Sequence, residues 1–267
     1  MLNFISFGSG SSGNCYFLYT GTEGLMIDIG IGIRTLRKHM HEFGLSLKDI
    51  HYLLITHDHA DHIKSVGNLS KEGNIPVFTT HAVHEGIVKN RYVKSKIPLS
   101  AVKNIEKGET RRLGAFKVTA FGVPHDSTDN VGYRIEYEDV VLCLMTDVGH
   151  VTDEMKGMIS EADYLIIEAN HDEEMLQNGP YPHCLKQRIM SENGHLSNHN
   201  CGIAIAENAT PRLKHVWLCH LSEENNHPIL ARKTVEDTLL SYGVVVDKDF
   251  ELDVLKRTMP TGPFRLL

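Results

Sequence analysis

The segment His57-Asp58-His59-Ala60-Asp61-His62 directly follows the apolar run Tyr52-Leu53-Leu54-Ile55. A short apolar run of this kind predicts a buried strand that ends where the polar segment begins. Uncompensated polar groups beside a buried strand cost free energy, so packing alone gives no reason for this composition. Two imidazoles two positions apart in an extended segment can converge on one ion, and Asp61 and His62 can face a second ion nearby. A histidine-rich, solvated loop is the other interpretation, and the spacing disfavours it.

Length and composition limit the classes of protein that this chain can form. Its 267 residues, 41% hydrophobic and 23% charged, are enough for a full core in one large or two small domains. No linker divides the sequence, so we predict a single domain over residues 1–267. The N-terminal residues lack the basic and apolar regions of a secretory signal. No apolar stretch approaches the roughly 20 residues that cross a bilayer, so we expect no membrane association.

The cysteines and the charge bear on location and partners. Five cysteines are scattered without a C-x-x-C pair, which predicts buried free thiols in a reducing, cytoplasmic environment. The formal charge of −7 argues against a protein that coats nucleic acid in general, since such proteins are basic. It does not exclude a nuclease, because bound divalent ions add positive charge where a phosphate must lie.

Strand-like and helical segments alternate along the chain, which predicts an α/β protein. After a strand-like N-terminus, strands are expected at 15–19, 25–28, 52–55, 77–79, 116–121, 131–137, 140–145, 164–167, 216–218 and 251–255. Helices are expected at 33–43, 63–72, 81–89, 152–159, 185–192, 201–207 and 229–242. The segment Tyr137-Glu138-Asp139-Val140 predicts a hairpin, and the helical crossovers predict parallel pairs. Two mixed sheets with helices outside them would accommodate these elements.

Four more polar side chains follow predicted strands elsewhere in the chain. Asp28 ends Leu25-Met26-Ile27 and could orient a ligating imidazole, or be an ordinary turn residue. His125 follows a proline that stiffens its loop. Asp147 ends a long apolar run, where a carboxylate is costly unless it is paired or metal-bound; a helix N-cap five residues away is a weaker alternative. His220 follows another apolar run, and taken alone it would more often be a buried core histidine.

Together these donors predict a centre with two divalent metal ions. We expect one ion to be bound by His57, His59 and His125, the other by Asp61, His62 and His220, with Asp147 bridging. Imidazole and carboxylate donors suit zinc or manganese, and iron with less ease. Two neighbouring cations lower the pKa of a shared water and polarise an electrophilic phosphorus or carbonyl. The expected chemistry is hydrolysis by a metal-bridging hydroxide, with Asp61 part of the catalytic centre.

These motifs, in this order, resemble the metallo-β-lactamase superfamily over nearly the whole chain. The resemblance implies an αββα sandwich, with two mixed β-sheets flanked by helices and a dinuclear site at one edge. Three segments are similar to the YycJ/WalJ-like exonuclease group: the loop 8–14, the stretch 185–198, and the stretch 220–226. The resemblance implies cleavage of phosphodiester bonds in nucleic acid, with DNA favoured over RNA.

Glu168 and His195 are similar to a carboxylate–histidine pair of the tRNA 3′-processing branch. The resemblance implies that Glu168 orients His195 and that His195 protonates the leaving oxygen. A general acid with a pKa near 7 typically contributes about a hundredfold or more to such a step. The alternative is that His195 caps the helix expected to begin near Asn198.

Candidate substrate contacts lie in the segments that carry the resemblance. Arg188 could form paired hydrogen bonds with a phosphate, or be a solvated helix charge. The serine- and glycine-rich loop could turn donors toward an anion or be a flexible turn, and it lacks the lysine of a nucleotide P-loop. The full set of expected contacts is Ser9, Ser11, Ser12, Asn14, Arg188, Ser222 and Asn226.

The leading hypothesis is therefore a metal-dependent phosphodiesterase that acts on nucleic acid, specifically a DNA exonuclease. The alternative is a hydrolase of the same superfamily that cleaves a small thioester, lactone or cyclic phosphodiester. A non-catalytic binding protein is disfavoured by the full ligand set. The sequence does not determine the metal, the strand polarity or the oligomeric state.

Overall fold

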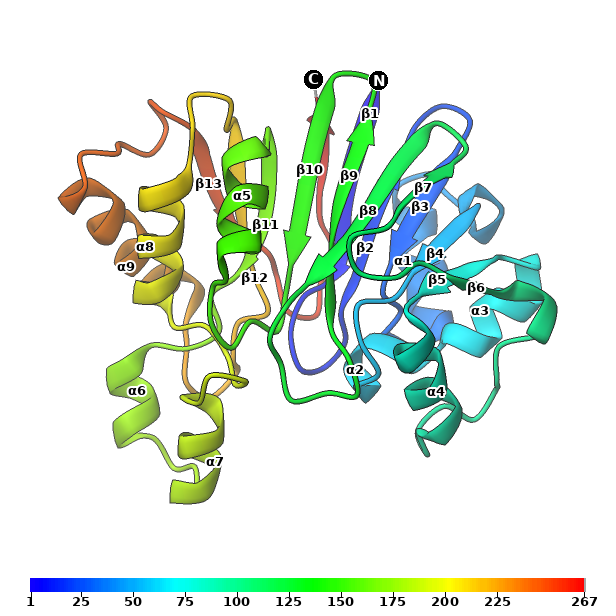
Figure 1. The fold of residues 1–267 in the computed structure, drawn as a ribbon, viewed down its shortest axis with the longest axis horizontal. Coiled ribbons are helices and arrows are strands. Elements are labelled where there is room, and N and C mark those ends of the chain that lie inside the picture. The colour runs from blue at the N-terminus through cyan, green and yellow to red at the C-terminus, as the bar shows by residue number, and fades with distance from the viewer. Residues whose placement is uncertain (267) are drawn as a thin grey trace. The chain divides into compact units, whose positions relative to one another are not determined.

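The computed structural model describes residues 1–266, which form two mixed β-sheets of seven strands each, flanked by helices (Figure 1). The first sheet has the strand order β14-β1-β2-β3-β4-β5-β6, and the second has the order β13-β12-β11-β10-β9-β8-β7. The predicted α/β class with two mixed sheets and outer helices is confirmed. No helix in residues 1–266 is both long and apolar enough to span a membrane.

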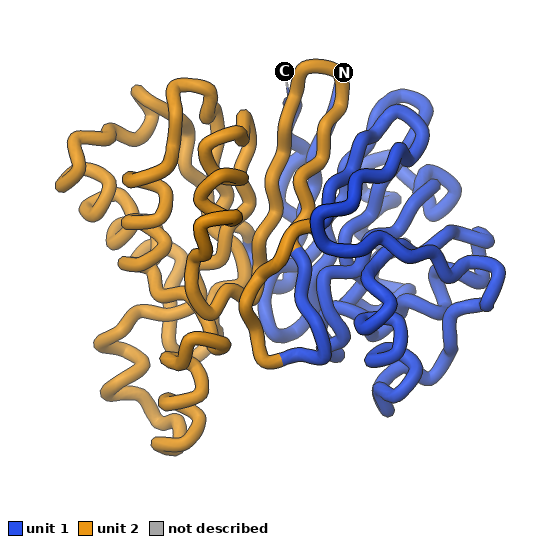
Figure 2. The backbone as a smooth tube through the Cα atoms, in the orientation of Figure 1, with its two compact units in different colours: residues 1–120, 127–131, 256–267 blue, residues 121–126, 132–255 orange. Residues whose placement is uncertain are grey.

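The chain divides into two compact units, which Figure 2 colours separately. Unit 1 comprises residues 1–120, 127–131 and 256–267, and unit 2 comprises residues 121–126 and 132–255. Each unit has its own hydrophobic core. The expectation of a single domain over the whole chain stays a prediction.

Unit 1 is built on the first sheet. Its strands are β1 Leu2–Gly8, β2 Cys15–Tyr19, β3 Gly24–Ile27, β4 Tyr52–Leu54, β5 Val77–Thr79, β6 Val102–Asn104 and β14 Thr261–Leu266. Strand β1 pairs antiparallel with both β14 and β2, and β2 pairs antiparallel with β3. From β3 to β6 the neighbours are parallel. The hairpin of β7 Thr110–Leu113 and β8 Phe116–Gly122 is antiparallel.

The helices of unit 1 are the crossovers that parallel pairing requires. They are α1 Ile33–Glu42, α2 Ala60–Ile63, α3 Val66–Gly73 and α4 His81–Lys89, with short 3-10 turns at Leu47–Asp49 and Leu99–Ala101. Leu36 of α1, Leu69 of α3 and Val83 of α4 are fully buried in one cluster with Phe17 and Leu53 of the sheet. Apolar helix faces therefore cover one face of this sheet.

Unit 2 contains β9 Val131–Tyr137, β10 Val140–Met145, β11 Tyr164–Glu168, β12 His215–Cys219 and β13 Glu251–Val254. Strands β9 and β10 form the predicted hairpin, in which Glu138 takes a left-handed turn conformation with φ 53°. From β10 to β13 the neighbours are parallel. Parallel strands end at the same edge of the sheet, so the residues after β10, β11 and β12 lie close together.

The helices of unit 2 are α5 Asp153–Glu161, α6 Glu173–Asn178, α7 His183–Ile189, α8 Asn198–Asn208 and α9 Pro228–Ser241. Alternate residues of β10, namely Val141, Cys143 and Met145, are buried in one cluster with residues of α5, α8 and α9. This period of two is expected for a strand with one face covered by helices.

Most predicted elements are present within a few residues of their expected bounds. The helix expected at 63–72 is instead two helices, α2 and α3, because the chain bends at Ser65, whose N–H donates to the carbonyl of Ile29. The sequence does not predict strands β6, β7 and β14 or helix α6. Most of their side chains are exposed or half-buried, so these segments carry little apolar signal.

The five cysteines are free thiols, and all except the exposed Cys184 are buried. Burial raises the pKa of Cys143 to about 12, and it also raises the pKa of Cys201. The reactive species is the thiolate, so these buried groups are unreactive. The expected free thiols are confirmed for all five cysteines, and the expected burial is confirmed for four of them but is wrong for Cys184.

We predict that a thiol reagent such as DTNB modifies one cysteine of the folded protein rapidly, and the other four only after unfolding. The reason is that only Cys184 is exposed. Cys184→Ser should remove the fast phase without changing the slow one. More than one fast thiol in the native protein would contradict the burial described above.

Candidate metal centre

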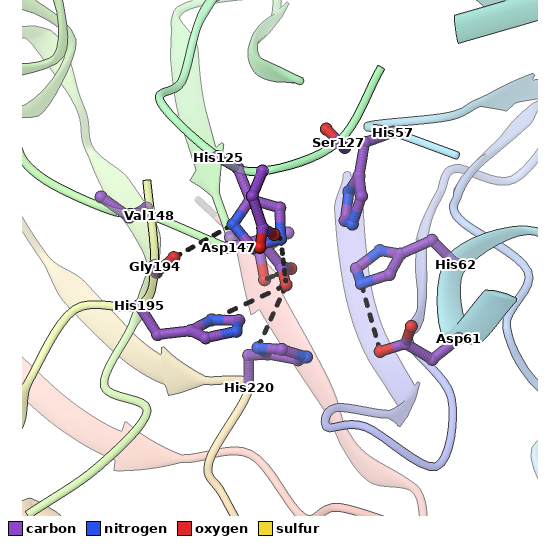
Figure 3. Close-up of polar contacts among 12 residues, drawn as sticks. His57, Asp61, His62, His125, Ser127, Asp147, Val148, Gly194, His195 and His220 are labelled. Atoms are coloured by element: carbon purple, nitrogen blue, oxygen red, sulfur yellow. Dashed lines mark hydrogen bonds and ion pairs between the residues drawn. The ribbon is translucent and has the colours of Figure 1, made fainter. Parts of the chain in front are cut away.

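The motif that follows β4 places four potential metal ligands in unit 1. His57 and His62 are fully buried, and their ring centroids lie 4.0 Å apart. His59 is the N-cap of α2, and the ring centroids of His57 and His59 are 4.7 Å apart. Asp61 lies one residue before His62, and its Oδ2 is 3.6 Å from His62 Nε2 (Figure 3). These four side chains therefore form one compact group of imidazole and carboxylate donors.

A buried carboxylate holds His62 in place. His62 Nδ1 donates to Asp28 Oδ2 at 2.7 Å, and Asp28 also accepts from the backbone and the hydroxyl of Thr56 at 2.9 Å each. The charge on Asp28 requires Nδ1 to carry the proton, which makes Nε2 the nitrogen that can ligate. The role expected of Asp28 from the sequence thus agrees with its position.

The loop at 8–14 supports the motif from the other side. The Asn14 N–H donates to the carbonyl of Asp61 at 2.7 Å, and the Asn14 amide nitrogen lies 2.9 Å from His62 Nε2. Gly30 packs so tightly here that a Cβ would lie 1.5 Å from the Asp61 carbonyl oxygen. Close backbone packing therefore fixes the start of α2.

Asp58 lies within the motif but forms hydrogen bonds to the surrounding loops instead of joining the group of potential metal ligands. Its carboxylate accepts from the N–H and the hydroxyl of Thr128 at 3.1 and 2.7 Å, and its carbonyl accepts from Asn90. A Cβ on Gly86 would lie 2.1 Å from Asp58 Oδ2. Asp58 therefore anchors the loop, in agreement with its omission from the predicted ligands.

Unit 2 contains a second group of donors at the ends of its parallel strands. Asp147, Glu168, His195 and His220 each offer a ligand atom within 4.8 Å of the others. Asp147 Oδ1 lies 3.6 Å from His125 Nε2 and 3.5 Å from His220 Nδ1 (Figure 3). All of these side chains are buried or half-buried. The predicted ligands His125, Asp147 and His220 are thus neighbours.

Glu168, the last residue of β11, organises this group. Its Oε1 accepts from His195 Nδ1 at 2.9 Å and from His220 Nδ1 at 2.8 Å. Its Oε2 accepts from the N–H groups of Val148 and Leu196 at 2.7 and 3.0 Å. Burial alone would raise the pKa of Glu168, but the neighbouring His195 and His220 outweigh burial and hold the pKa well below its usual range. Glu168 is therefore ionised and fixes both imidazoles.

His195 is 18% exposed at its side chain, and it presents Nε2 on the ring edge opposite Glu168. Burial lowers the pKa of His195, but the charge and the hydrogen bond of Glu168 raise it by more than burial lowers it. The pKa of His195 therefore lies above the ordinary value. The helix that begins at Asn198 is capped by Ser197, whose hydroxyl accepts from the Asn200 N–H at 3.2 Å. The alternative in which His195 caps this helix is therefore wrong.

His125 is fixed by the chain that carries His195. Its Nδ1 donates to the Gly194 carbonyl at 3.0 Å, so Nε2 faces Asp147. The next residue, Asp126, forms a two-point ion pair with the guanidinium of Arg188, including a 2.9 Å hydrogen bond from Nη2 to Oδ1. The side chain expected to contact a phosphate is thus held by a carboxylate.

Three site residues at strand ends have left-handed backbone conformations. In unit 1 this is Asp28, with φ 57°, and in unit 2 these are Asp147, with φ 57°, and His220, with φ 53°. Such conformations cost non-glycine residues free energy and cluster at functional sites. The turn re-aims each side chain immediately after its buried strand.

The remaining predicted substrate contacts have varied positions. Ser9 is buried, with its hydroxyl 2.9 Å from that of Tyr16, while Ser11 and Ser12 are exposed. Ser222 accepts from the Asn225 N–H. The amide nitrogen of Asn226 donates to the carbonyls of Ala169 and Asn170 and to Asn198. Asn226 therefore secures the chain that follows β11.

Sequence reasoning overlooked His171. It is 3% exposed and lines a pocket of about 240 Å³ together with His195, Ser197 and Asn200. Burial lowers the pKa of His171 to about 4, so it is neutral at pH 7. Its place three residues after Glu168 was the available signal, but an isolated histidine outside a motif does not stand out.

Comparison with known proteins identifies the class of this chain. Residues 25–220 match the family model of the beta-lactamase superfamily domain. The chain belongs to this superfamily, in its metallo-β-lactamase form. It is 34% identical to exodeoxyribonuclease YycJ of Bacillus anthracis over 97% of both chains. It is 36% identical to exodeoxyribonuclease WalJ of Streptococcus pneumoniae over 91% of this chain and 90% of that protein.

The fold agrees with this assignment. The metallo-β-lactamase fold protein YhfI of Bacillus subtilis superposes with a TM-score of 0.71 at 19% identity, over 97% of this chain and 98% of the other. The predicted superfamily and the predicted resemblance to the YycJ/WalJ group are confirmed. The chain is therefore a metal-dependent hydrolase.

The chemistry of the donor set fits divalent metal ions. In His62, His125 and His220 the Nδ1 atom donates to a carboxylate or a carbonyl, so Nε2 is the unprotonated nitrogen that can ligate. This arrangement is typical of metal-ligating histidines. Imidazoles with aspartates indicate a divalent transition ion rather than calcium.

We predict that Asp28→Asn lowers the apparent metal affinity by about 10- to 100-fold while the chain stays folded. Asparagine tolerates the left-handed conformation but provides no charge to hold the proton on His62 Nδ1. Titration against a chromophoric chelator measures the affinity, and circular dichroism checks the fold.

Asp163→Asn is the matched control, because Asp163 is also a buried carboxylate that accepts from a backbone N–H, that of Val141 at 2.9 Å. It lies outside the groups of donors and should leave metal affinity unchanged. Equal affinities in wild type and Asp28→Asn would contradict the role of Asp28.

Proposed function

We propose that this hydrolase cleaves phosphodiester bonds of nucleic acid and acts as an exonuclease on DNA. The observation that carries this proposal is the similarity to two exodeoxyribonucleases at 34–36% identity over more than nine-tenths of the chain. The hydrogen-bonded pair of Glu168 and His195 supports it, because expulsion of an alkoxide from a phosphodiester needs a proton donor. A nucleic-acid substrate also agrees with the expected cytoplasmic location.

The proposed cofactor is a pair of divalent ions, zinc or manganese. The proposed ligands are His57, His59, Asp61, His62, His125, Asp147 and His220. Their division between two ions follows from the donor spacing in residues 57–62, where His57 and His59 can converge on one ion while Asp61 and His62 face the other. When bound, such ions lower the pKa of coordinated water and neutralise charge on the phosphate oxygens.

The residues of unit 2 supply the proton for the leaving group. Glu168 fixes the ring of His195 through Nδ1 and raises the pKa of this imidazole, because the carboxylate stabilises the imidazolium. The proton on Nε2 then passes to the leaving alkoxide oxygen. The departing end of the substrate would occupy the pocket that His195 lines together with His171.

We predict that His195→Ala slows DNA cleavage by about a hundredfold or more at unchanged metal content. The same variant should hydrolyse bis(4-nitrophenyl) phosphate at nearly the wild-type rate, because nitrophenolate leaves without a proton. His199→Ala, which removes an exposed histidine of unit 2 outside the groups of donors, is the control and should affect neither substrate. An equal loss on both substrates would rule out the acid role of His195.

The function itself is tested by incubating the metal-loaded protein with end-labelled single- and double-stranded DNA and RNA, with circular DNA, with a thioester and with a cyclic dinucleotide. We expect linear DNA to lose nucleotides from an end and circular DNA to persist. Comparable cutting of circles would contradict exonuclease action. Preferential turnover of the thioester or the cyclic dinucleotide would instead favour the small-molecule alternative.

A further inference from the structure

Unit 1 contains a hollow of about 620 Å³ that the functions described above do not use. It lies where the start of α1, the end of α2 and the loop around residues 92–95 meet. Its walls include Arg34, Lys64, Asn68, Tyr92 and Lys94. We call these five residues and the space they enclose the basic hollow.

The basic hollow has an excess of positive charge. Arg34, Lys64 and Lys94 are exposed, and none of them forms an ion pair within residues 1–266. No acidic side chain of the described chain lines the hollow. In a chain with a formal charge of −7, three uncompensated cations around one depression indicate a site for an anionic partner.

The start of α1 adds to this field. Gly32 is the N-cap and, with Ile33, lines the hollow. No side chain caps this helix end, and its first turn contains no acidic residue. The N–H groups of the first turn and the helix dipole therefore also favour an anion here, and phosphate is a common ligand at such ends.

Tyr92 adds an exposed aromatic ring to the basic hollow. Its side chain is an exposed large hydrophobic group, 72% accessible. Its backbone is fixed in a turn, because its N–H donates to Asn90 Oδ1 at 2.8 Å and its carbonyl accepts from the Lys94 N–H at 3.1 Å. An exposed aromatic ring beside cations is the combination that binds unpaired bases by stacking.

The basic hollow is bonded to the helix that carries Asp61 and His62. Lys64 is the C-cap of α2, two residues after His62. The Ile29 N–H donates to the His62 carbonyl at 2.7 Å, and the Ser65 hydroxyl donates to the Ile31 carbonyl at 2.7 Å. A nucleic-acid strand whose end lies at the candidate ligands of unit 1 would therefore have the basic hollow beside it, within the same unit.

We propose that the basic hollow binds single-stranded DNA, with its phosphates near Arg34, Lys64 and Lys94 and an unpaired base on Tyr92. This inference rests on the proposed function and adds the place where the uncleaved strand is held. An acidic peptide has no bases for Tyr92 to stack on, and a duplex keeps its bases stacked. The surface therefore fits a single strand better than either.

The test measures binding of an end-labelled, phosphorothioate-linked deoxythymidine oligomer to the metal-loaded protein by fluorescence anisotropy at several salt concentrations. Replacing Arg34, Lys64 and Lys94 together by Ala should weaken binding about tenfold or more at low salt. It should also flatten the plot of log Kd against log salt by about 2, since each contact with a single strand contributes about 0.7.

The matched control replaces Lys48, Lys103 and Arg112 by Ala. These are exposed cations of unit 1 outside the hollow, and their removal changes the net charge equally. Tyr92→Ala should weaken binding about fivefold to a hundredfold, whereas Tyr92→Phe should bind like wild type, because stacking needs the ring and not the hydroxyl.

Equal effects of the two triple variants, or no effect of either, would overturn the proposal. So would displacement of the oligomer by polyglutamate as effectively as by unlabelled strand. Hydrolysis of bis(4-nitrophenyl) phosphate should be unchanged in the triple variant of the hollow. If wild type binds the strand through the hollow yet cleaves no nucleic acid, the proposed function fails alone. If wild type cleaves DNA and the hollow variant binds and cleaves equally well, this inference fails alone.

Discussion

The carboxylate of Glu168 is the constraint on which the site in unit 2 depends. A fully buried charge is tolerated only when hydrogen bonds replace water, and Glu168 accepts four, from two imidazoles and two backbone N–H groups. These bonds fix the ring orientations of His195 and His220 and the chain around Val148 and Leu196. One carboxylate thus fixes the ring orientation of both the candidate proton donor, His195, and the candidate ligand, His220.

In unit 1 the buried carboxylate that orients an imidazole is Asp28. This buried carboxylate aims His62 and ties the motif to β3, while Asn14 and Gly30 fix the backbone of α2 by close packing. Within the motif itself, Asp58 is an anchor and its neighbours are donors. Polar residues that look equivalent in sequence therefore divide into those that bind and those that hold the binders in place.

Parallel strands explain why such groups collect where they do. In unit 2, Asp147 and His220 follow β10 and β12, and Glu168 ends β11; these parallel strands end at one sheet edge. Left-handed residues at Asp147 and His220 turn the side chains immediately after the strands. The buried strands fix the positions of these residues, and the left-handed turns set the directions of their side chains. Asp147 and His220 could be predicted from the sequence for the same reason, because each follows an apolar run.

The sequence by itself determined the α/β class, the superfamily and the candidate ligands, since apolar periodicity and motif spacing are local properties. The tertiary structure alone decided which polar residues are held and by what. Arg188 is paired with Asp126, Asn226 secures backbone carbonyls, and Glu168 holds two histidines rather than one. The sequence also did not predict exposed strands such as β6, or the basic hollow. Hydrogen-bond partners and surface charge arise between segments distant along the chain, so spacing in sequence does not encode them.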